Sequence, residues 1–275
     1  MTGMYMRIVH RIFFALPLFL LCFACVPSPT PMGDEKALQT WERYTARAKA
    51  AEINTGPFRV SGTLRYTGYD GQSTRVSSLL WGNGGLESPY PLRLDLIAGV
   101  GNVVAKIRED QSSFLAYDPN ENVAYTHDRG LNTLVSFGVP IPLTLSDLTL
   151  LLTGRSGALL LPYTENGMPP MPEEHTRTEN GFSYAVHVAN LPGRLEIGDA
   201  GAPISWTEFR EGGWTIGFDT RDDNPLLIRR LRISHPDGYS ALIVVREFER
   251  LPKAFSADHL SLALPKGTET RALEE

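Results

Sequence analysis

Residues 137–155 read FGVPIPLTLSDLTLLLTGR, and nine of these nineteen residues are Phe, Val, Ile or Leu. Only Asp147 and Arg155 are charged. Pro140 and Pro142 predict an extended break, because a residue that precedes proline avoids the helical region. So apolar a stretch is unusual on the surface of a water-soluble domain. We therefore expect it to cover an apolar surface formed by the rest of the chain.

A short helix is expected on each side of this break. The first falls within residues 130–137. For the second, Ser146 is the expected N-cap, and Asp147 is favourable near the positive end of the helix dipole. Gly154 or Gly157 would end that helix. The sequence thus predicts two short apolar helices between two runs of strands.

Segments that alternate between apolar and polar residues surround this insert, and turn signals such as YDGQ, GNGG and DPNEN separate them. The expected strands are 58–66, 74–81, 91–97, 102–108, 113–118, 122–127, 182–188, 193–197, 203–210, 213–219, 226–234, 240–249 and 260–265. A polar, proline-rich loop is expected over 162–181. A single curved antiparallel sheet with the helices in its concave side fits this pattern better than two domains, because the sheet cannot bury its inner face alone.

A longer helix is expected before the first strand, from an N-cap at Asp34 to about Ile53. Its apolar residues recur every three or four positions, which predicts one buried face. They are Leu38, Trp41, Tyr44, Ala48 and Ala51.

Residues 1–24 are expected to be a signal peptide. A basic start precedes twelve apolar residues, 13–24, a run shorter than the roughly 20 that span a membrane. The small residue before Cys25 resembles the lipobox of bacterial lipoprotein precursors, in which that cysteine is lipidated; a plain signal peptide is the alternative. Residues 25–33 are then an extended, proline-rich tether.

Composition narrows the classes of function. The chain has 275 residues and a net charge of −5, which argues against a nucleic-acid-binding surface. It contains no G-x-S-x-G, H-E-x-x-H or P-loop motif. Five of the six histidines lie beyond the expected signal peptide and are scattered without the spacing of metal ligands: His127, His175, His187, His235 and His259. We therefore expect a protein that is not an enzyme and requires neither a cofactor nor a metal ion.

The order of motifs resembles the outer-membrane lipoprotein receptor family LolB, within the wider LolA/LolB-like fold. The resemblance covers about residues 34–157, and its most specific part is GVPIPL (138–143) followed by LTLLLTG (148–154). The other matching features are Cys25, Trp41, GTLRY (62–66), Trp81, LRLDL (92–96) and the loop IAGVGN (97–102). The family's second helix usually carries a tryptophan, and here Leu151 or a neighbour stands in its place.

The resemblance implies a mainly β fold over residues 34–275: a half-open antiparallel barrel of about 11–13 strands with the helices covering its concave face. The sheet would enclose unfilled apolar volume under a removable lid. The expected cavity and lid residues are Trp41, Trp81, Ile141, Leu143, Leu145, Leu148, Leu151 and Leu152. Ile97 and Val100 would form a loop that inserts into the membrane.

The same resemblance implies that a monomer, anchored in the outer membrane through Cys25, faces the periplasm. It would accept acylated lipoproteins from a periplasmic LolA-like carrier and pass them to the inner leaflet of the outer membrane. Two alternatives remain open: a structural or assembly lipoprotein with a filled interior, and a carrier of another lipid. The leucine run equally suits a core helix, and Val100 equally suits an ordinary hairpin turn. Arg229, Arg230 and Arg232 would face lipid headgroups, an acidic partner or solvent.

Overall fold

The computed structural model describes residues 34–52, 56–68, 70–84, 91–128, 133–160, 170–188, 191–210, 212–222, 224–225 and 227–273. The chain divides into two compact units, residues 1–36 and 37–275. Of the first unit only Asp34–Lys36, which begin helix α2 (Asp34–Glu52), are described. The expected signal peptide, Cys25 and the tether lie outside the described residues. The buried apolar core recorded for the described residues belongs wholly to the second unit.

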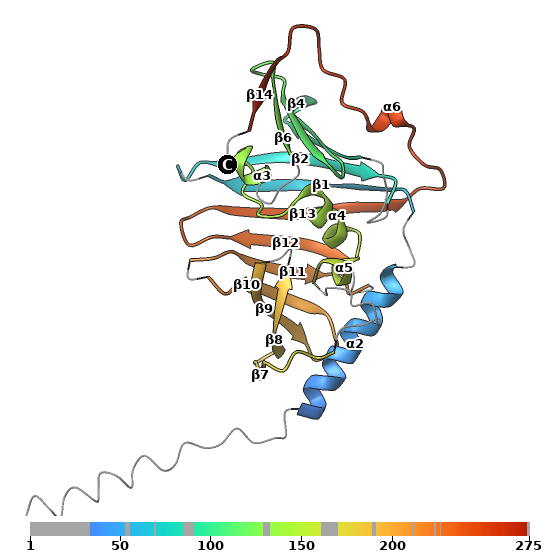
Figure 1. Ribbon diagram of the computed structural model, residues 1–275, viewed down its shortest axis with the longest axis vertical. Coiled ribbons are helices and arrows are strands. Elements are labelled where there is room, and N and C mark those ends of the chain that lie inside the picture. Colours follow the sequence, from blue (N-terminus) through green and yellow to red (C-terminus); the bar gives the residue numbers. More distant parts are fainter. Residues whose placement is uncertain are drawn as a thin grey trace, which may run out of the picture. The chain divides into compact units, whose positions relative to one another are not determined.

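Within the described residues, fourteen strands of the second unit form one open sheet, drawn as a stack in Figure 1. The strands in chain order are β1 (Phe58–Thr67), β2 (Ser73–Gly82), β3 (Leu92–Ala98), β4 (Asn102–Glu109), β5 (Ser113–Asp118), β6 (Val123–Asp128), β7 (His175–Arg177), β8 (Gly181–Val188), β9 (Leu191–Gly198), β10 (Pro203–Glu208), β11 (Thr215–Thr220), β12 (Ile228–Ser234), β13 (Ser240–Arg250) and β14 (Glu269–Ala272). Their order in the sheet is β14-β6-β5-β4-β3-β2-β1-β13-β12-β11-β10-β9-β8-β7. The predicted mainly β fold with one unclosed sheet is confirmed.

The early and late parts of the chain meet in the middle of the sheet, where β1 pairs with both β2 and β13. On β1 the buried Leu64 precedes the exposed Arg65, so successive side chains point to opposite faces as expected for a pleated strand. The pairings are antiparallel except that of β14 with β6, which is parallel. One face of the sheet is therefore apolar, and it must be covered.

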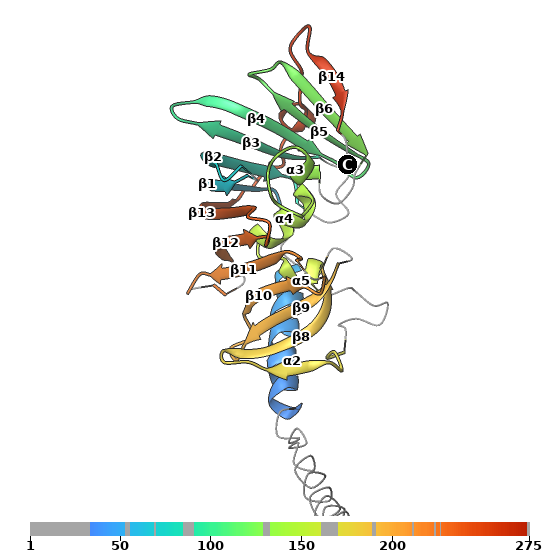
Figure 2. The same cartoon turned by 90° about the vertical axis from the view of Figure 1, so that its left-hand side faces the viewer.

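Among the described residues, three short helices rather than the expected two lie on that face: α3 (Thr133–Ser136), α4 (Leu145–Leu152) and α5 (Ser156–Leu160). Figure 2 shows them on one side of the central strands. The predicted break at the two prolines is confirmed, since residues 139–143 are not helical. The predicted N-cap at Ser146 is wrong, because Thr144 caps α4. Gly154 adopts a φ of 81° directly after the helix and ends it.

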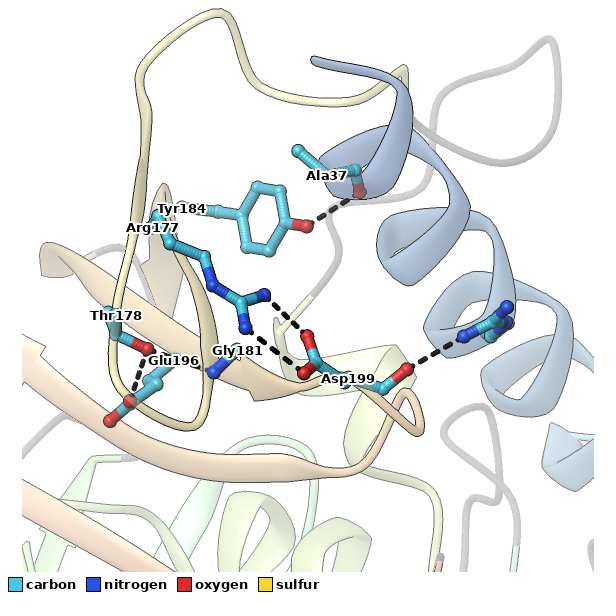
Figure 3. A network of polar contacts seen from close by, with 8 residues as sticks. Ala37, Arg177, Thr178, Gly181, Tyr184, Glu196 and Asp199 are labelled. Carbon is cyan, nitrogen blue, oxygen red and sulfur yellow. Dashed lines mark hydrogen bonds and ion pairs between the residues drawn. The ribbon is translucent and has the colours of Figure 1, made fainter. Parts of the chain in front are cut away.

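Helix α2 packs against β8 through its buried face. The Tyr184 hydroxyl donates to the Ala37 carbonyl at 2.7 Å, and the Tyr184 ring lies 5.0 Å from the Trp41 ring. Figure 3 shows the hydrogen bond from Tyr184 to Ala37 beside the ion pair of Arg177 with Asp199, whose nitrogen–oxygen distance is 2.6 Å. These contacts come from residues far apart in the chain, so they fix the helix to this part of the sheet.

The expected strand over 260–265 is wrong. A short helix, α6 (Ala257–Leu260), ends at the first residue of this segment, and Ser256 caps it by accepting a hydrogen bond from the His259 backbone. The residues up to Lys266 then run without regular structure. Strand β14 forms only afterwards. A serine N-cap satisfies backbone groups locally, which competes with extended pairing.

Candidate functional site

A small apolar cavity lies between the inner face of the sheet and helix α4. Four central strands, β1, β2, β3 and β13, form its floor, and the proline-containing segment and α4 cover it. The lining residues are Val60, Gly62, Leu64, Ser78, Leu80, Leu94, Leu96, Ile141, Leu148, Leu152, Ile243 and Val245. Ser78 carries the only polar side chain among them, so this surface suits hydrocarbon and offers little to a polar ligand.

The cavity has a volume of about 20 Å³. On this scale a single buried water needs about 10–15 Å³. The large unfilled volume that the resemblance implies is therefore not present here, and that expectation is corrected. The reason is that α4 fills the space itself: Leu145 and Leu151 are fully buried, and Leu148 and Leu152 are 3% and 4% exposed. Six of the eight residues of α4 are buried, so the helix packs into the core in this position.

The start of α4 is well defined by local hydrogen bonds. The Thr144 side chain accepts from the Asp147 backbone N–H at 3.0 Å, and the Asp147 carboxylate accepts from the Thr144 backbone N–H at 3.2 Å. This reciprocal capping box satisfies two groups that the first turn would otherwise leave unpaired. It explains why a helix of only eight residues begins at this point directly after the proline break.

A second, long-range anchor holds the same turn. Glu109, at the end of β4, is 2% exposed. Its two carboxylate oxygens accept hydrogen bonds from the backbone N–H groups of Leu145 and Ser146, each at 2.9 Å. A buried carboxylate at a helix N-terminus is stabilised by these donors and by the helix dipole. Glu109 therefore ties α4 to the sheet. Sequence reasoning missed it, although it continues the inward-facing alternation of Ala105 and Ile107.

Apart from Trp81, the expected cavity residues divide into three groups. Ile141, Leu148 and Leu152 line the cavity. Leu143, Leu145 and Leu151 are buried in the core without lining it. Trp41 packs against Tyr44 and Tyr184, with its ring 6.0 Å and 5.0 Å from theirs, and belongs to the contact of α2 with β8.

Trp81 is placed on the opposite face of the sheet, so its assignment to the cavity is wrong. It follows Leu80, which lines the cavity, and neighbouring residues of a strand alternate between faces. The guanidinium of Arg93 lies 5.2 Å from the centre of the Trp81 ring. Arg93 also pairs with Asp95 at 3.0 Å and donates to the Ser261 carbonyl. Trp81 thus belongs to the contact between the outer face and the C-terminal segment.

The hairpin between β3 and β4 exposes Val100 completely, with a relative exposure of 106%. Gly99 and Gly101 flank it with φ angles of 53° and 82°, values that favour glycine and allow the tight turn. Ile97 is half-buried and pairs with Ser77, on the face opposite the cavity. Two other large apolar side chains are exposed among the described residues, Leu38 at 42% and Phe209 at 47%. Val100 is therefore the most accessible of the three.

The charged residues of the described ranges form no metal-binding cluster. No group of three or more His, Cys, Asp or Glu side chains there could hold a metal ion. Arg229, Arg230 and Arg232 share the carboxylate of Asp219, at 3.1, 3.8 and 3.7 Å. None of the helices in this part of the chain is both long enough and apolar enough to cross a membrane.

No protein-family model matches the sequence, and no curated protein matches it significantly. Solved structures do resemble it. A LolA superfamily protein from Nitrosomonas europaea aligns with a TM-score of 0.51 and 8% identity, over 82% of this chain and 97% of that one. A DUF1329 family protein from Desulfovibrio piger aligns with a TM-score of 0.53 and 9% identity, over the same shares of the two chains. The protein therefore has a LolA/LolB-like fold.

Proposed function

We propose that this protein is a lipid-anchored acceptor of lipoproteins. It receives acylated lipoproteins from a periplasmic LolA-like carrier, holds their acyl chains against the inner face of the sheet, and inserts them into the outer membrane. The observation that carries the proposal is the apolar cavity under α4, whose twelve lining residues include one polar side chain. Cys25 lies outside the described residues, and its role as the lipid anchor is proposed from the sequence alone. Such an anchor is stable when it carries more than one acyl chain.

An acyl chain can enter only when α4 moves, because the closed cavity is about 20 Å³. The leucines of α4 and an acyl chain offer the sheet the same kind of contact, so exchanging one for the other leaves the apolar face covered. The binding-competent state is then an open form populated to a small extent, and cargo shifts the population toward it. Release into a bilayer gives the transfer its direction.

The nearly filled interior favours a second candidate, a structural or assembly lipoprotein that uses the same fold as a protein-binding scaffold. In that case α4 is a permanent part of the core. A carrier of another lipid is the third candidate, and it shares the moving helix but not the cargo.

A fluorescent fatty-acid probe separates these candidates. Residues 34–275 contain every described helix and strand and the recorded core, so this segment is the folded domain to use. The proposed function predicts that the probe binds with a blue-shifted, enhanced emission and that an acylated peptide displaces it. The same peptide without its acyl chains should not. If the domain binds no probe, the protein is a structural or assembly lipoprotein. If free lipid displaces the probe but the acylated peptide does not, the protein carries another lipid.

A further inference from the structure

We propose that the outer face of the sheet beside the β3–β4 hairpin is a docking surface for an anionic phospholipid bilayer. The proposal rests on the proposed function and deepens it, since it specifies how the domain approaches the membrane. The surface is a row of arginines, Arg75, Arg65 and Arg232, which we call the arginine row. It lies next to the exposed tip at Val100.

The strand registers align the arginine row across four strands. Arg75 on β2 pairs with Arg65 on β1, Arg65 pairs with Leu242 on β13, and Leu242 pairs with Arg232 on β12. Neighbouring strands lie about 4.8 Å apart, so the row spans roughly 14 Å. The three arginines are exposed and face away from the cavity, because the buried Leu64, Val76 and Leu231 next to them point inward.

Arg65 and Arg75 are unusual because they are like charges directly opposite each other on adjacent strands. Such a pair destabilises a sheet. No hydrogen bond or ion pair within the described residues engages either guanidinium. Asp70, in the turn between these two strands, accepts from the Gln72 backbone N–H at 2.9 Å. A repulsive, uncompensated pair is a local conflict of the kind that proteins keep at functional surfaces.

The rest of the neighbourhood leaves the surface basic. Arg230 stands beside Arg232 and pairs with Val244 in the next row of the sheet. Asp219 is the carboxylate that Arg229, Arg230 and Arg232 share, and its side chain is 22% exposed. Asp237 lies in the turn between β12 and β13, 3.4 Å from His235. The carboxylates are thus fewer than the arginines, although the whole chain carries a net charge of −5.

Val100, the apolar tip of the β3–β4 hairpin, lies at the same ends of the central strands as the arginine row. Ser77 pairs with Ile97, so Arg75, two residues earlier on the same face, extends toward the turn at Gly99–Gly101. Figure 2 shows the β3–β4 hairpin projecting past the neighbouring strands at the upper left. An exposed apolar side chain beside unpaired cations fits a bilayer with anionic headgroups, because one part enters the interface and the other meets the phosphates. A purely acidic protein surface would leave Val100 without an apolar partner.

Vesicle flotation with residues 34–275, without cargo, tests this surface. The vesicles are pure phosphatidylcholine or an equal mixture of phosphatidylcholine and phosphatidylglycerol. We expect the wild-type domain to bind the mixed vesicles, to bind the neutral ones far more weakly, and to dissociate as salt is added. Each arginine near an anionic surface contributes roughly a factor of five, so Arg65→Gln with Arg75→Gln should weaken binding about 25-fold.

The matched control removes the same charge elsewhere. Lys49→Gln with Lys253→Gln changes two exposed lysines, one on α2 and one after β13, and should leave vesicle binding within about twofold of wild type. The arginine variant relieves a repulsive pair, so it should fold at least as well as the wild type. Equal binding by the arginine variant and the wild type would overturn the proposal, as would equal binding to both kinds of vesicle or no binding to either. The fatty-acid probe assay is independent of these outcomes, so its failure and the failure of membrane docking can be told apart.

Discussion

The carboxylate of Glu109 accepts a hydrogen bond from the backbone N–H of Leu145 at 2.9 Å, and this contact joins the end of β4 to the first turn of α4. Glu109 is 36 residues away in the chain and 2% exposed. The capping box at Thr144 is local, so it would move with α4, whereas the Glu109 contact must break if α4 leaves the sheet. Glu109 is therefore a polar anchor that holds this helix to the sheet in addition to its buried leucines.

Replacing that acid should loosen the helix. In Glu109→Gln the amide can no longer accept from two backbone donors as a charged group does, and we expect the free energy of unfolding to fall by about 1–3 kcal/mol. The part of this loss that destabilises the closed form relative to the form with α4 displaced raises the open fraction. The apparent affinity for the fatty-acid probe then increases by roughly fivefold for each 1 kcal/mol of that relative destabilisation. Urea unfolding and probe titration measure the two effects.

Glu208→Gln is the matched control for that variant. Glu208 is 7% exposed and accepts from the Trp214 backbone N–H at 3.2 Å, so its replacement should also destabilise the fold. It has no contact with α4 of the kind Glu109 makes, and probe affinity should stay at the wild-type value. Equal probe affinity in both variants would show that Glu109 does not control the opening of the site.

A plug in the cavity should prevent acyl binding. Ser78 lines the cavity and Ser77, next to it on β2, is exposed on the other face. Ser78→Leu introduces hydrocarbon where about 20 Å³ is free, and overpacking of this kind costs roughly 1–3 kcal/mol. We expect this variant to lose probe binding while Ser77→Leu retains it. Circular dichroism checks that both are folded, and unchanged probe binding by folded Ser78→Leu would place the site elsewhere.

The exposed hairpin offers a test of delivery. Val100→Glu changes a fully exposed residue, so the free energy of unfolding should shift by no more than about 0.5 kcal/mol. Probe binding should be unaffected. Transfer of an acylated peptide into vesicles should stop, because a carboxylate resists entry into the bilayer interface. Val100→Leu is the control and should transfer normally; normal transfer by Val100→Glu would show that the hairpin is only a turn.

The sequence predicted the sheet and the break in the insert because both depend on local patterns. Alternation over 58–66 and the pair Pro140 and Pro142 act on neighbouring residues, and the structure confirms them. The N-cap was misplaced by two residues because Thr144 and Ser146 are both good caps, and the Asp147 side chain reaches back to Thr144.

The site was less predictable, because its parts come from distant strands. Side chains alternate between the two faces along β2, so the face of Trp81 depends on which residues of this strand point inward. The expected strand over 74–81 does not determine that. The parallel pairing of β14 with β6 and the contact of Glu109 with α4 join segments far apart in the chain. The size of the cavity depends on how closely α4 packs, and the apolar pattern of a helix does not determine that distance.

Alkaline unfolding tests the attachment of α2. Burial raises the pKa of Tyr184 above its ordinary value of 10, and the negative charge of Asp199 raises it further; burial also raises the pKa of Tyr44. Above pH 10 the unfolded chain releases these two protons while the folded protein keeps them. Stability should therefore be unaffected by these groups below pH 10 and should fall above it, by up to about 1.4 kcal/mol per pH unit for each tyrosine.

Tyr184→Phe separates the two contributions. It removes the hydrogen bond to the Ala37 carbonyl and should cost about 1 kcal/mol at neutral pH. Above pH 10 its stability should fall less steeply than that of the wild type, because one of the two buried phenols is gone. Urea midpoints measured from pH 8 to pH 11 give both quantities. Parallel curves for the variant and the wild type would mean that Tyr184 is not the group that keeps its proton, and would leave the alkaline loss to Tyr44.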